Sequence, residues 1–193
     1  LPARELHAQS GRAVSTYEYF SAYALPPRQL FALVFPYFFG GAVGGPYHTT
    51  PFATSFWGPW EINLATGYVG LTGLLLAVLA VICMRGKQDQ SFVTFWACVA
   101  LVAVLLALGP ALPFDINRLL HRIPVYNVFR GLYRHLYEFN FAVAVLAGWA
   151  VNELGKARIS ARRLAVGTGL IAALVALTAT AYLVFARSWV RTK

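Results

Sequence analysis

Positions 64 to 84 read LATGYVGLTGLLLAVLAVICM, an apolar run without a single charged residue. At 1.5 Å per residue, a helix of this length reaches about 30 Å, which is the thickness of the hydrocarbon core of a bilayer. Backbone polar groups in lipid must be satisfied inside the segment or in a closed sheet, and this run does not alternate as barrel strands do. The stretch therefore predicts a transmembrane helix.

Three further segments resemble it. Residues 91–108 and 163–186 are long and apolar, whereas 136–154 is weaker because Glu138, Asn140, Asn152 and Glu153 lie near its ends. We therefore predict an all-α fold, a polytopic transmembrane helix bundle over residues 64–187 with about four spanning helices at 64–84, 91–108, 136–154 and 163–186, followed by a tail at 188–193.

Composition supports lipid as the solvent. Of the 193 residues, 59% are hydrophobic and 12% are charged, while soluble domains are about one quarter charged. The net charge of +9 would suggest nucleic acid in a soluble protein, but here the cations lie at the ends of apolar segments, where they anchor helices to headgroups. Nucleic acid is therefore excluded as a partner. Cys83 and Cys98 are interpreted as small apolar residues.

Residues 1–63 are polar and aromatic, and we predict an extracytoplasmic segment. Pro26 and Pro27 can open a helix, and the apolar run at 30–39 is about half a membrane crossing and contains Pro36. This pattern indicates a short interfacial or re-entrant helix. The chain starts at Leu1 without the charged and apolar regions of a signal peptide, so we expect it to be a fragment of a larger polypeptide.

Orientation follows from the short loops. Segments 85–90 and 155–163 are rich in Lys and Arg, which the positive-inside rule assigns to the cytoplasm. Residues 1–63 and 110–135 are then extracytoplasmic. Four arginines in 110–135 and three cations in 187–193 oppose this assignment.

The loop before the third span carries the most chemistry. If it is helical from about Val128, Arg130 and Arg134 lie four residues apart on one face, with Tyr133 and Tyr137 beside them. Two guanidinium groups at headgroup level can bind a phosphate through paired hydrogen bonds. The alternative is that these residues are interfacial anchors and that Arg134 pairs with a carboxylate one turn later.

Glu138 is that carboxylate. It lies at the mouth of a span and can serve as a base, although pairing with Arg134 explains it equally well. The four histidines lack the spacing of metal ligands, and no phosphate loop, nucleophile elbow or HExxH motif is present. His48 is a loop residue that is a weaker candidate for contact with substrate or metal.

Several short patches occur in an order that resembles a known family. They are Pro2 to Glu5 with Ser10-Gly-Arg12, Leu25-Pro-Pro-Arg-Gln-Leu30, Phe35-Pro-Tyr-Phe-Phe-Gly40, Trp57-Gly-Pro-Trp60, Gly67-Tyr-Val-Gly70, and Pro124 through Phe129-Arg130 and Arg134 to Ala144-Val-Leu-Ala-Gly148. The chain resembles, over most of residues 1–155, the YfhO-type bacterial membrane proteins, relatives of the GT-C superfamily of glycosyltransferases that use polyprenyl-phosphate-linked sugars.

The resemblance implies a location in the bacterial cytoplasmic membrane and a role for these residues. In such proteins the catalytic acid lies in an early extracytoplasmic loop, so it is expected upstream of Leu1, in the remainder of the same polypeptide. This chain would supply the cavity for lipid phosphate and acceptor. Arg130, Arg134 and Arg12 would bind phosphate, and Tyr133, Tyr137, Glu138 and His48 would line the cavity. No cofactor is expected in this chain, and a divalent cation in the full-length protein is left open.

Three functions remain open at this point. The first is a glycosyltransferase acting on a polyprenyl-phosphate sugar, the second is a transporter or flippase of lipid-linked saccharide, and the third is a non-catalytic assembly subunit. An Asp or Glu between two spans upstream of Leu1 would favour the transferase, and repeated halves without such a loop would favour the transporter.

Overall fold

The computed structural model describes residues 16–36, 38–39, 67–83, 87–124, 126–128, 131–156 and 160–191. Within these ranges the chain is all-α and contains no strand. In chain order the elements are α2 (Tyr17–Ser21), the 3-10 helix η1 (Pro27–Leu33), α3 (Leu71–Cys83), α4 (Lys87–Leu108), η3 (Gly109–Ala111), α5 (Asn117–Leu120), η4 (Tyr126–Val128), η5 (Leu132–Arg134), α6 (His135–Gly155) and α7 (Ala161–Arg191).

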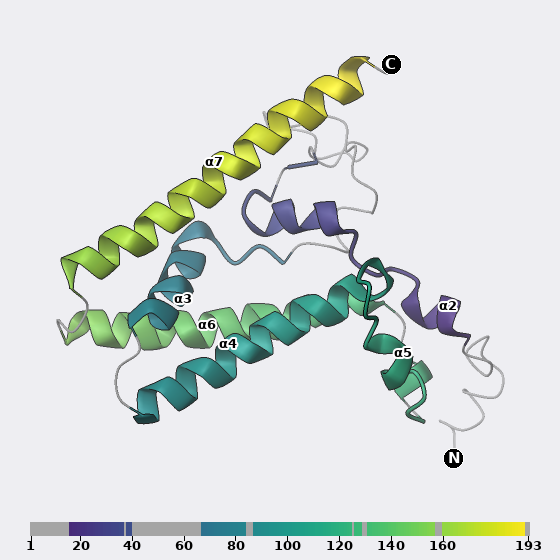
Figure 1. Ribbon diagram of the computed structural model, residues 1–193, viewed down its shortest axis with the longest axis horizontal. Helices are drawn as coiled ribbons and strands as arrows, with labels where there is room; N and C mark the ends of the chain where they lie inside the picture. Colours follow the sequence, from purple (N-terminus) through teal and green to yellow (C-terminus); the bar gives the residue numbers. More distant parts are fainter. Residues whose placement is uncertain are drawn as a thin grey trace, which may run out of the picture.

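Helices α4 and α6 lie side by side in opposite directions, and α3 packs on α6 at the end where α4 begins (Figure 1). Their shared core is apolar, with Leu79, Val93 and Ala150 fully enclosed and Leu146 nearly so. Each fully buried Leu or Val side chain contributes about 1.5–3 kcal/mol, so this three-helix contact is the main source of tertiary stability among the described residues.

Helix α7 crosses the other elements diagonally and contacts α3 (Figure 1). Gly167 allows the approach, because a Cβ at this position would lie 2.5 Å from a methyl of Leu79. The guanidinium of Arg163 donates a hydrogen bond of 3.2 Å to the carbonyl of Cys83, the last residue of α3. The two helices are thus joined by close packing and by a polar contact at one end.

Parts of two separate segments cap the end where α4 finishes and α6 begins. The Leu25 amide donates to the Ala107 carbonyl at 2.7 Å, and the Tyr133 amide donates to the Tyr23 carbonyl at 3.2 Å. Leu25 is packed with Leu136 in a second apolar cluster. The described residues of 1–63 that make these contacts therefore lie at the same end as 110–135.

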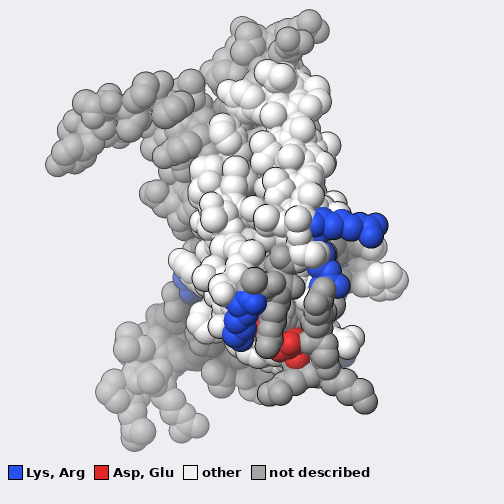
Figure 2. Space-filling view, turned by 90° about the vertical axis from the view of Figure 1, so that its left-hand side faces the viewer, with Lys and Arg blue, Asp and Glu red and all other residues white. Residues whose placement is uncertain are grey.

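The opposite end carries cations. Lys156 at the end of α6 pairs with buried Glu153 at 3.0 Å, and exposed Arg162 and half-exposed Arg163 open α7. Figure 2 looks onto this end and shows Lys and Arg side chains beside a small acidic patch, with an uncharged surface above them. The described residues of the basic segment predicted at 155–163 thus lie at the far end of the bundle from those of the 110–135 segment.

The first predicted span differs from the helix observed. Residues 67–70 are not helical, and α3 begins only at Leu71, after Gly70 adopts a left-handed φ of +83°. The side-chain amide of Asn140 in α6 is oriented with its nitrogen toward Gly67, and it donates a hydrogen bond of 2.9 Å to the Gly67 carbonyl. A helix predicted from residue 64 is therefore wrong over 67–70, because this stretch is held by a side chain of another helix.

Two of the described helical stretches are long and apolar enough to cross a membrane, Asp89–Ala111 and Ala161–Val184, and α3 is a shorter apolar helix. Helix α6 covers the third predicted segment and has 21 residues. The all-α class is confirmed in the described residues.

Candidate functional site

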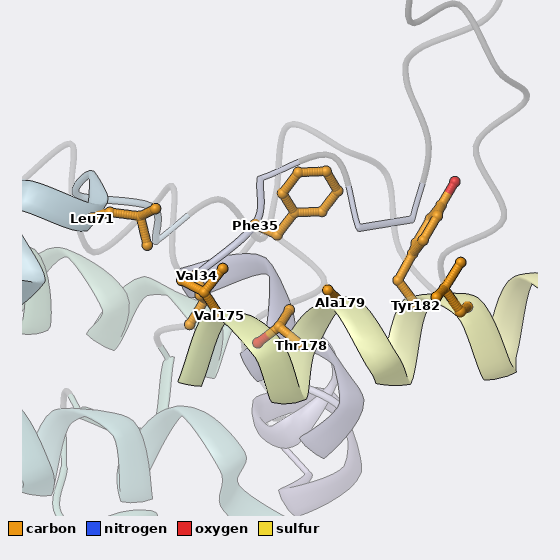
Figure 3. A pocket seen from close by; sticks show the side chains of 8 residues that line it. Val34, Phe35, Leu71, Val175, Thr178, Ala179 and Tyr182 are labelled. Carbon is orange, nitrogen blue, oxygen red and sulfur yellow. The ribbon is translucent and has the colours of Figure 1, made fainter. Parts of the chain in front are cut away.

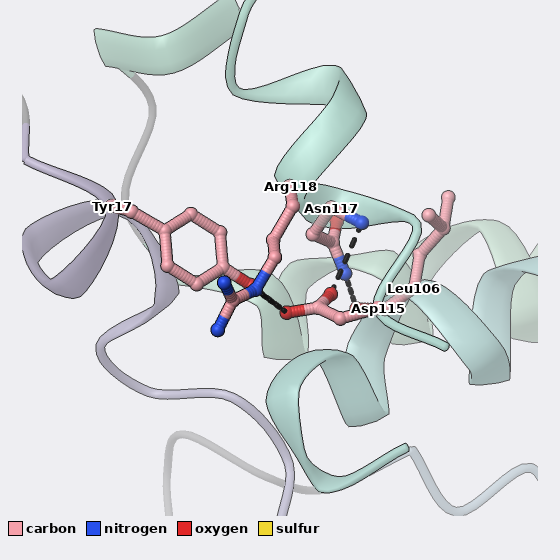
Figure 4. A network of polar contacts seen from close by, with 5 residues as sticks. All are labelled: Tyr17, Leu106, Asp115, Asn117 and Arg118. Carbon is pink, nitrogen blue, oxygen red and sulfur yellow. Dashed lines mark hydrogen bonds and ion pairs between the residues drawn. The ribbon is translucent and has the colours of Figure 1, made fainter. Parts of the chain in front are cut away.

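A polar network fixes the small helices onto the end of α4 (Figure 4). The Tyr17 hydroxyl of α2 donates to the carboxylate of Asp115, which also accepts from the Asn117 backbone amide at 3.1 Å. The Asn117 side chain donates to the Leu106 carbonyl at 2.9 Å. Arg118 lies 4.0 Å from the same carboxylate and over the Tyr17 ring at 5.2 Å. This cation therefore already has structural partners.

Beside this network, three titratable side chains form a chain of hydrogen bonds. The Tyr126 hydroxyl of η4 lies 3.1 Å from Nε2 of His135. Nδ1 of His135 lies 2.6 Å from Oε2 of Glu138, one turn further along α6. The His135 side chain is 16% exposed and that of Glu138 is 57% exposed. The chain thus runs from a half-buried phenol through an enclosed imidazole to a carboxylate in contact with solvent.

Burial and the nearby Glu138 carboxylate both raise the pKa of the Tyr126 phenol, and burial is the larger cause. An ionised phenolate would lose hydration and would be repelled by the carboxylate. The Tyr126 hydroxyl therefore keeps its proton at neutral pH and can both donate and accept a hydrogen bond.

One face of this chain opens into a hollow of about 240 Å³. Arg134 lies at its edge, and the ring of Phe20 and Leu132 supply apolar walls. The Arg134 side chain is exposed and forms no ion pair within the described part of the chain. The hollow therefore offers a free guanidinium next to the imidazole and the carboxylate.

The other face borders an apolar groove of about 480 Å³ along α4. Its α4 residues recur at helical spacing on one face: Phe95, Cys98, Val99, Val102, Ala103 and Leu106. The groove ends at Leu120, Tyr126, His135 and Glu138. Three residues, Tyr126, His135 and Glu138, line both the groove and the hollow. The two spaces therefore meet at the hydrogen-bonded chain.

A separate cavity of about 290 Å³ lies between the residues that follow η1, the start of α3, and α7 (Figure 3). Its walls are Val34, Phe35, Leu71, Val175, Thr178, Ala179, Tyr182 and Leu183. The hydroxyl of Thr178 donates to the Leu174 carbonyl of its own helix at 2.8 Å. Since none of the described residues that line this cavity is charged, it can hold an apolar group but offers no cation for phosphate.

The predicted site residues are only partly brought together. Arg134 and Glu138 share the hollow. Tyr133 is half-buried and Tyr137 is 71% exposed, and neither lines the hollow or the groove. Three further predicted site residues, Arg12, His48 and Arg130, lie outside the described residues.

The structure differs from two interpretations that the sequence left open. The helix does not extend back to Val128, because Gly131 adopts a left-handed φ of +94° and α6 begins at His135. Glu138 does not pair with Arg134 but with His135, three residues before it. Positions three and four residues apart are both neighbours on a helix, and Arg134 is in the 3-10 turn that precedes α6.

Sequence reasoning also missed Tyr126 and His135 as site residues. The spacing of three between His135 and Glu138 was a usable signal for their pairing. Nothing in the sequence joins Tyr126 to His135, since Tyr126 opens η4, and the turn at Gly131 and the whole of η5 lie between it and His135.

Comparisons with known proteins add no identity: no family model matches the chain, and no curated protein or solved structure matches it at a significant level.

Proposed function

We propose that the chain is a membrane-spanning part of a protein that acts on polyprenyl-phosphate-linked sugars, in the manner of GT-C-like glycosyltransferases. The observation that supports this most directly is the apolar groove along α4 that leads to the hollow containing Arg134. A long apolar tail next to an anionic headgroup is the shape of a polyprenyl phosphate. The groove suits the tail and the hollow suits the headgroup.

Membrane insertion is supported by where the apolar surface lies. Only 11% of the apolar stretch of α7 and 28% of that of α4 are buried. Leu170, Leu177 and Val184 of α7 are each more than half exposed. Buried core helices of soluble proteins hide such surface, whereas helices in lipid expose it. We infer that these two helices span the bilayer and that α6 and the segment including α3 complete four spans.

The orientation follows from the same proposal. The α4 residues that line the groove run from Phe95 to Leu106, eleven positions apart. At 1.5 Å per residue this is about 16 Å, or about half of a 30 Å hydrocarbon core. With the basic end of the bundle in the cytoplasm, the hollow with Arg134 lies at the outer headgroup level. The sugar would then be transferred on the extracytoplasmic side.

The role of this chain in transfer would be to hold the departing phosphate. A carboxylate elsewhere in the polypeptide would activate the acceptor hydroxyl, which displaces the lipid phosphate at the anomeric carbon. The guanidinium of Arg134 would stabilise the charge that develops on the leaving phosphate oxygens. Arg130 remains the proposed second phosphate ligand, and Arg12 the third.

The test uses the full-length protein in nanodiscs and two lipids, undecaprenyl phosphate and undecaprenol. A charge-assisted hydrogen bond contributes about 1.5–3 kcal/mol, so Arg134→Ala should weaken binding of the phosphate by about 10- to 100-fold. Binding of undecaprenol should be unchanged. Arg162→Ala, which removes an exposed cation at the opposite end, is the matched control.

The groove has its own pair of variants. Val102→Trp fills the groove, whereas Leu101→Trp places the same indole on the exposed neighbouring face of α4. We expect Val102→Trp, but not Leu101→Trp, to weaken the binding of both lipids. Equal binding of undecaprenyl phosphate to wild type, Arg134→Ala and Val102→Trp would refute the proposed site. Sugar transfer by the wild type would distinguish a transferase from a flippase that only binds.

A further inference from the structure

The hydrogen-bonded chain Tyr126–His135–Glu138 fixes where protons lie. An ionised carboxylate only accepts hydrogen bonds, so the 2.6 Å contact of Glu138 with Nδ1 of His135 requires the proton on Nδ1. In the neutral ring Nε2 is then a lone-pair acceptor, and the Tyr126 hydroxyl at 3.1 Å must donate to it. The phenol therefore presents only oxygen lone pairs to the hollow.

A second proton on the imidazole reverses this arrangement. Nε2 then carries a hydrogen and donates to the Tyr126 oxygen, so the phenolic hydrogen must turn away from His135. The two spaces that Tyr126 lines, the groove and the hollow, are where the hydrogen can turn. One proton at His135 thus changes the Tyr126 hydroxyl from an acceptor into a donor toward a ligand. Histidine side chains exchange such a proton between about pH 5 and 8.

The charges around the hollow make this change relevant to an anion. The titratable or charged side chains that line the two spaces are Arg134 from η5, Tyr126 from η4, Cys98 from α4, and His135 and Glu138 from α6. Helix α2 contributes only Phe20. With neutral His135, the charges of Arg134 and Glu138 cancel. With imidazolium, the net charge is +1, and the carboxylate no longer opposes an anionic headgroup.

We propose that Tyr126, His135 and Glu138 form a proton relay at the phosphate site, so that an anionic lipid phosphate binds together with one proton. The Tyr126 hydroxyl gives its proton to Nε2 of His135 while its oxygen takes a proton from solvent in the hollow, so an N–H bond forms and the O–H bond of Tyr126 is replaced. The new O–H of Tyr126 then donates a hydrogen bond to a phosphate oxygen. Release of the headgroup returns the proton to solvent. This inference rests on the proposed function, since it assumes that the hollow receives a phosphate.

The raised pKa of Tyr126, caused by burial and then by the charge of Glu138, supports this scheme. A phenol that stays protonated throughout the neutral range remains able to donate once His135 is charged. Tyr126 lines the hollow, so its hydroxyl links Nε2 of His135 to the space from which the proton comes.

The experiment measures binding of a polyprenyl phosphodiester sugar to the full-length protein in nanodiscs from pH 5.5 to 8.5. A phosphodiester carries one fixed negative charge in this range, so any proton taken up belongs to the protein. Proton uptake is measured by calorimetry in buffers of different ionisation enthalpy. Because binding and protonation are reciprocally linked, we expect uptake of up to one proton and affinity that falls by up to about tenfold per pH unit as the pH rises.

Two variants and one control assign the proton. His135→Gln should abolish both the uptake and the pH dependence. Tyr126→Phe retains the imidazole and the carboxylate but lacks the hydroxyl, and it should weaken binding at low pH by about tenfold while leaving binding at high pH unchanged. His121→Gln is the control, because His121 packs on Tyr17 and Phe20 and lines neither space.

Each outcome is decisive. Binding whose affinity does not vary with pH, or uptake that persists in His135→Gln, would overturn the relay and leave the proposed function intact. Failure of the wild type to bind the phosphodiester at any pH would overturn both.

Discussion

Gly167→Ala should destabilise the contact between α7 and α3, although alanine is the better helix former. A Cβ at position 167 would lie 2.5 Å from one methyl of Leu79 and 3.1 Å from its Cγ, and Leu79 is completely buried. Because protein interiors are close-packed, the leucine can move away only by displacing its neighbours. Overpacking of this kind costs about 1–3 kcal/mol, and the helix propensity gain returns about 0.5–1 kcal/mol. The net loss should be about 1 kcal/mol.

Gly169→Ala supplies the matched control. Position 169 lies in the same helix, and a Cβ there meets nothing within 4 Å. Gly169→Ala should gain the helix propensity of alanine without any clash. The free energies of unfolding of Gly167→Ala and Gly169→Ala should therefore differ by about 2 kcal/mol. The assay is reversible SDS-induced unfolding of the protein in mixed micelles, followed by tryptophan fluorescence.

A second arm tests the assigned cause. In a Leu79→Ala background the clashing methyl is absent, so Gly167→Ala should no longer destabilise, and the coupling between the two sites should be of about the same size as the clash. Equal stability of Gly167→Ala and Gly169→Ala would refute the close packing of α7 on α3. The same conclusion would follow if the penalty of Gly167→Ala persisted without the leucine.

Two further predictions concern polar contacts. Arg163→Ala should lower the free energy of unfolding by about 1 kcal/mol, because the carbonyl of Cys83 loses its donor at 3.2 Å; SDS unfolding measures this, and an unchanged value would contradict it. The free energy of unfolding should also fall as the pH rises through and above about 10. The pKa of Tyr126 is raised in the folded protein, so the unfolded chain loses the phenolic proton at a lower pH and is stabilised by doing so. The fall should be smaller in Tyr126→Phe, and parallel curves would remove Tyr126 as its cause.

The long helices were the predictable part of this fold. The apolar runs at 91–108 and 163–186 are far from any competing pattern, and α4 and α7 include them. The start of the first helix was not predictable, because residues 67–70 look as apolar as those that follow. Their non-helical conformation depends on Asn140, a side chain about seventy positions away that donates to the Gly67 carbonyl.

The partner of Glu138 shows a limit of local rules. A helix places both the third and the fourth preceding residue near a carboxylate, so Arg134 and His135 were equally suitable by spacing. The choice depended on where α6 begins, and the left-handed Gly131 sets that point. The sequence does not predict the left-handed conformation of Gly131, since a glycine in an aromatic loop is common.

The groove is hidden for a different reason. Helix α4 is apolar nearly all round, so its hydrophobic pattern cannot show which face packs on α6 and which borders the open space. The six groove residues recur at helical spacing, but so do those on the other faces. What distinguishes this face is its end, where η4 and the start of α6 place Tyr126, His135 and Glu138. A helix that composition alone describes as scaffold thus becomes one wall of the candidate site only because polar side chains from two other elements lie at the end of its groove.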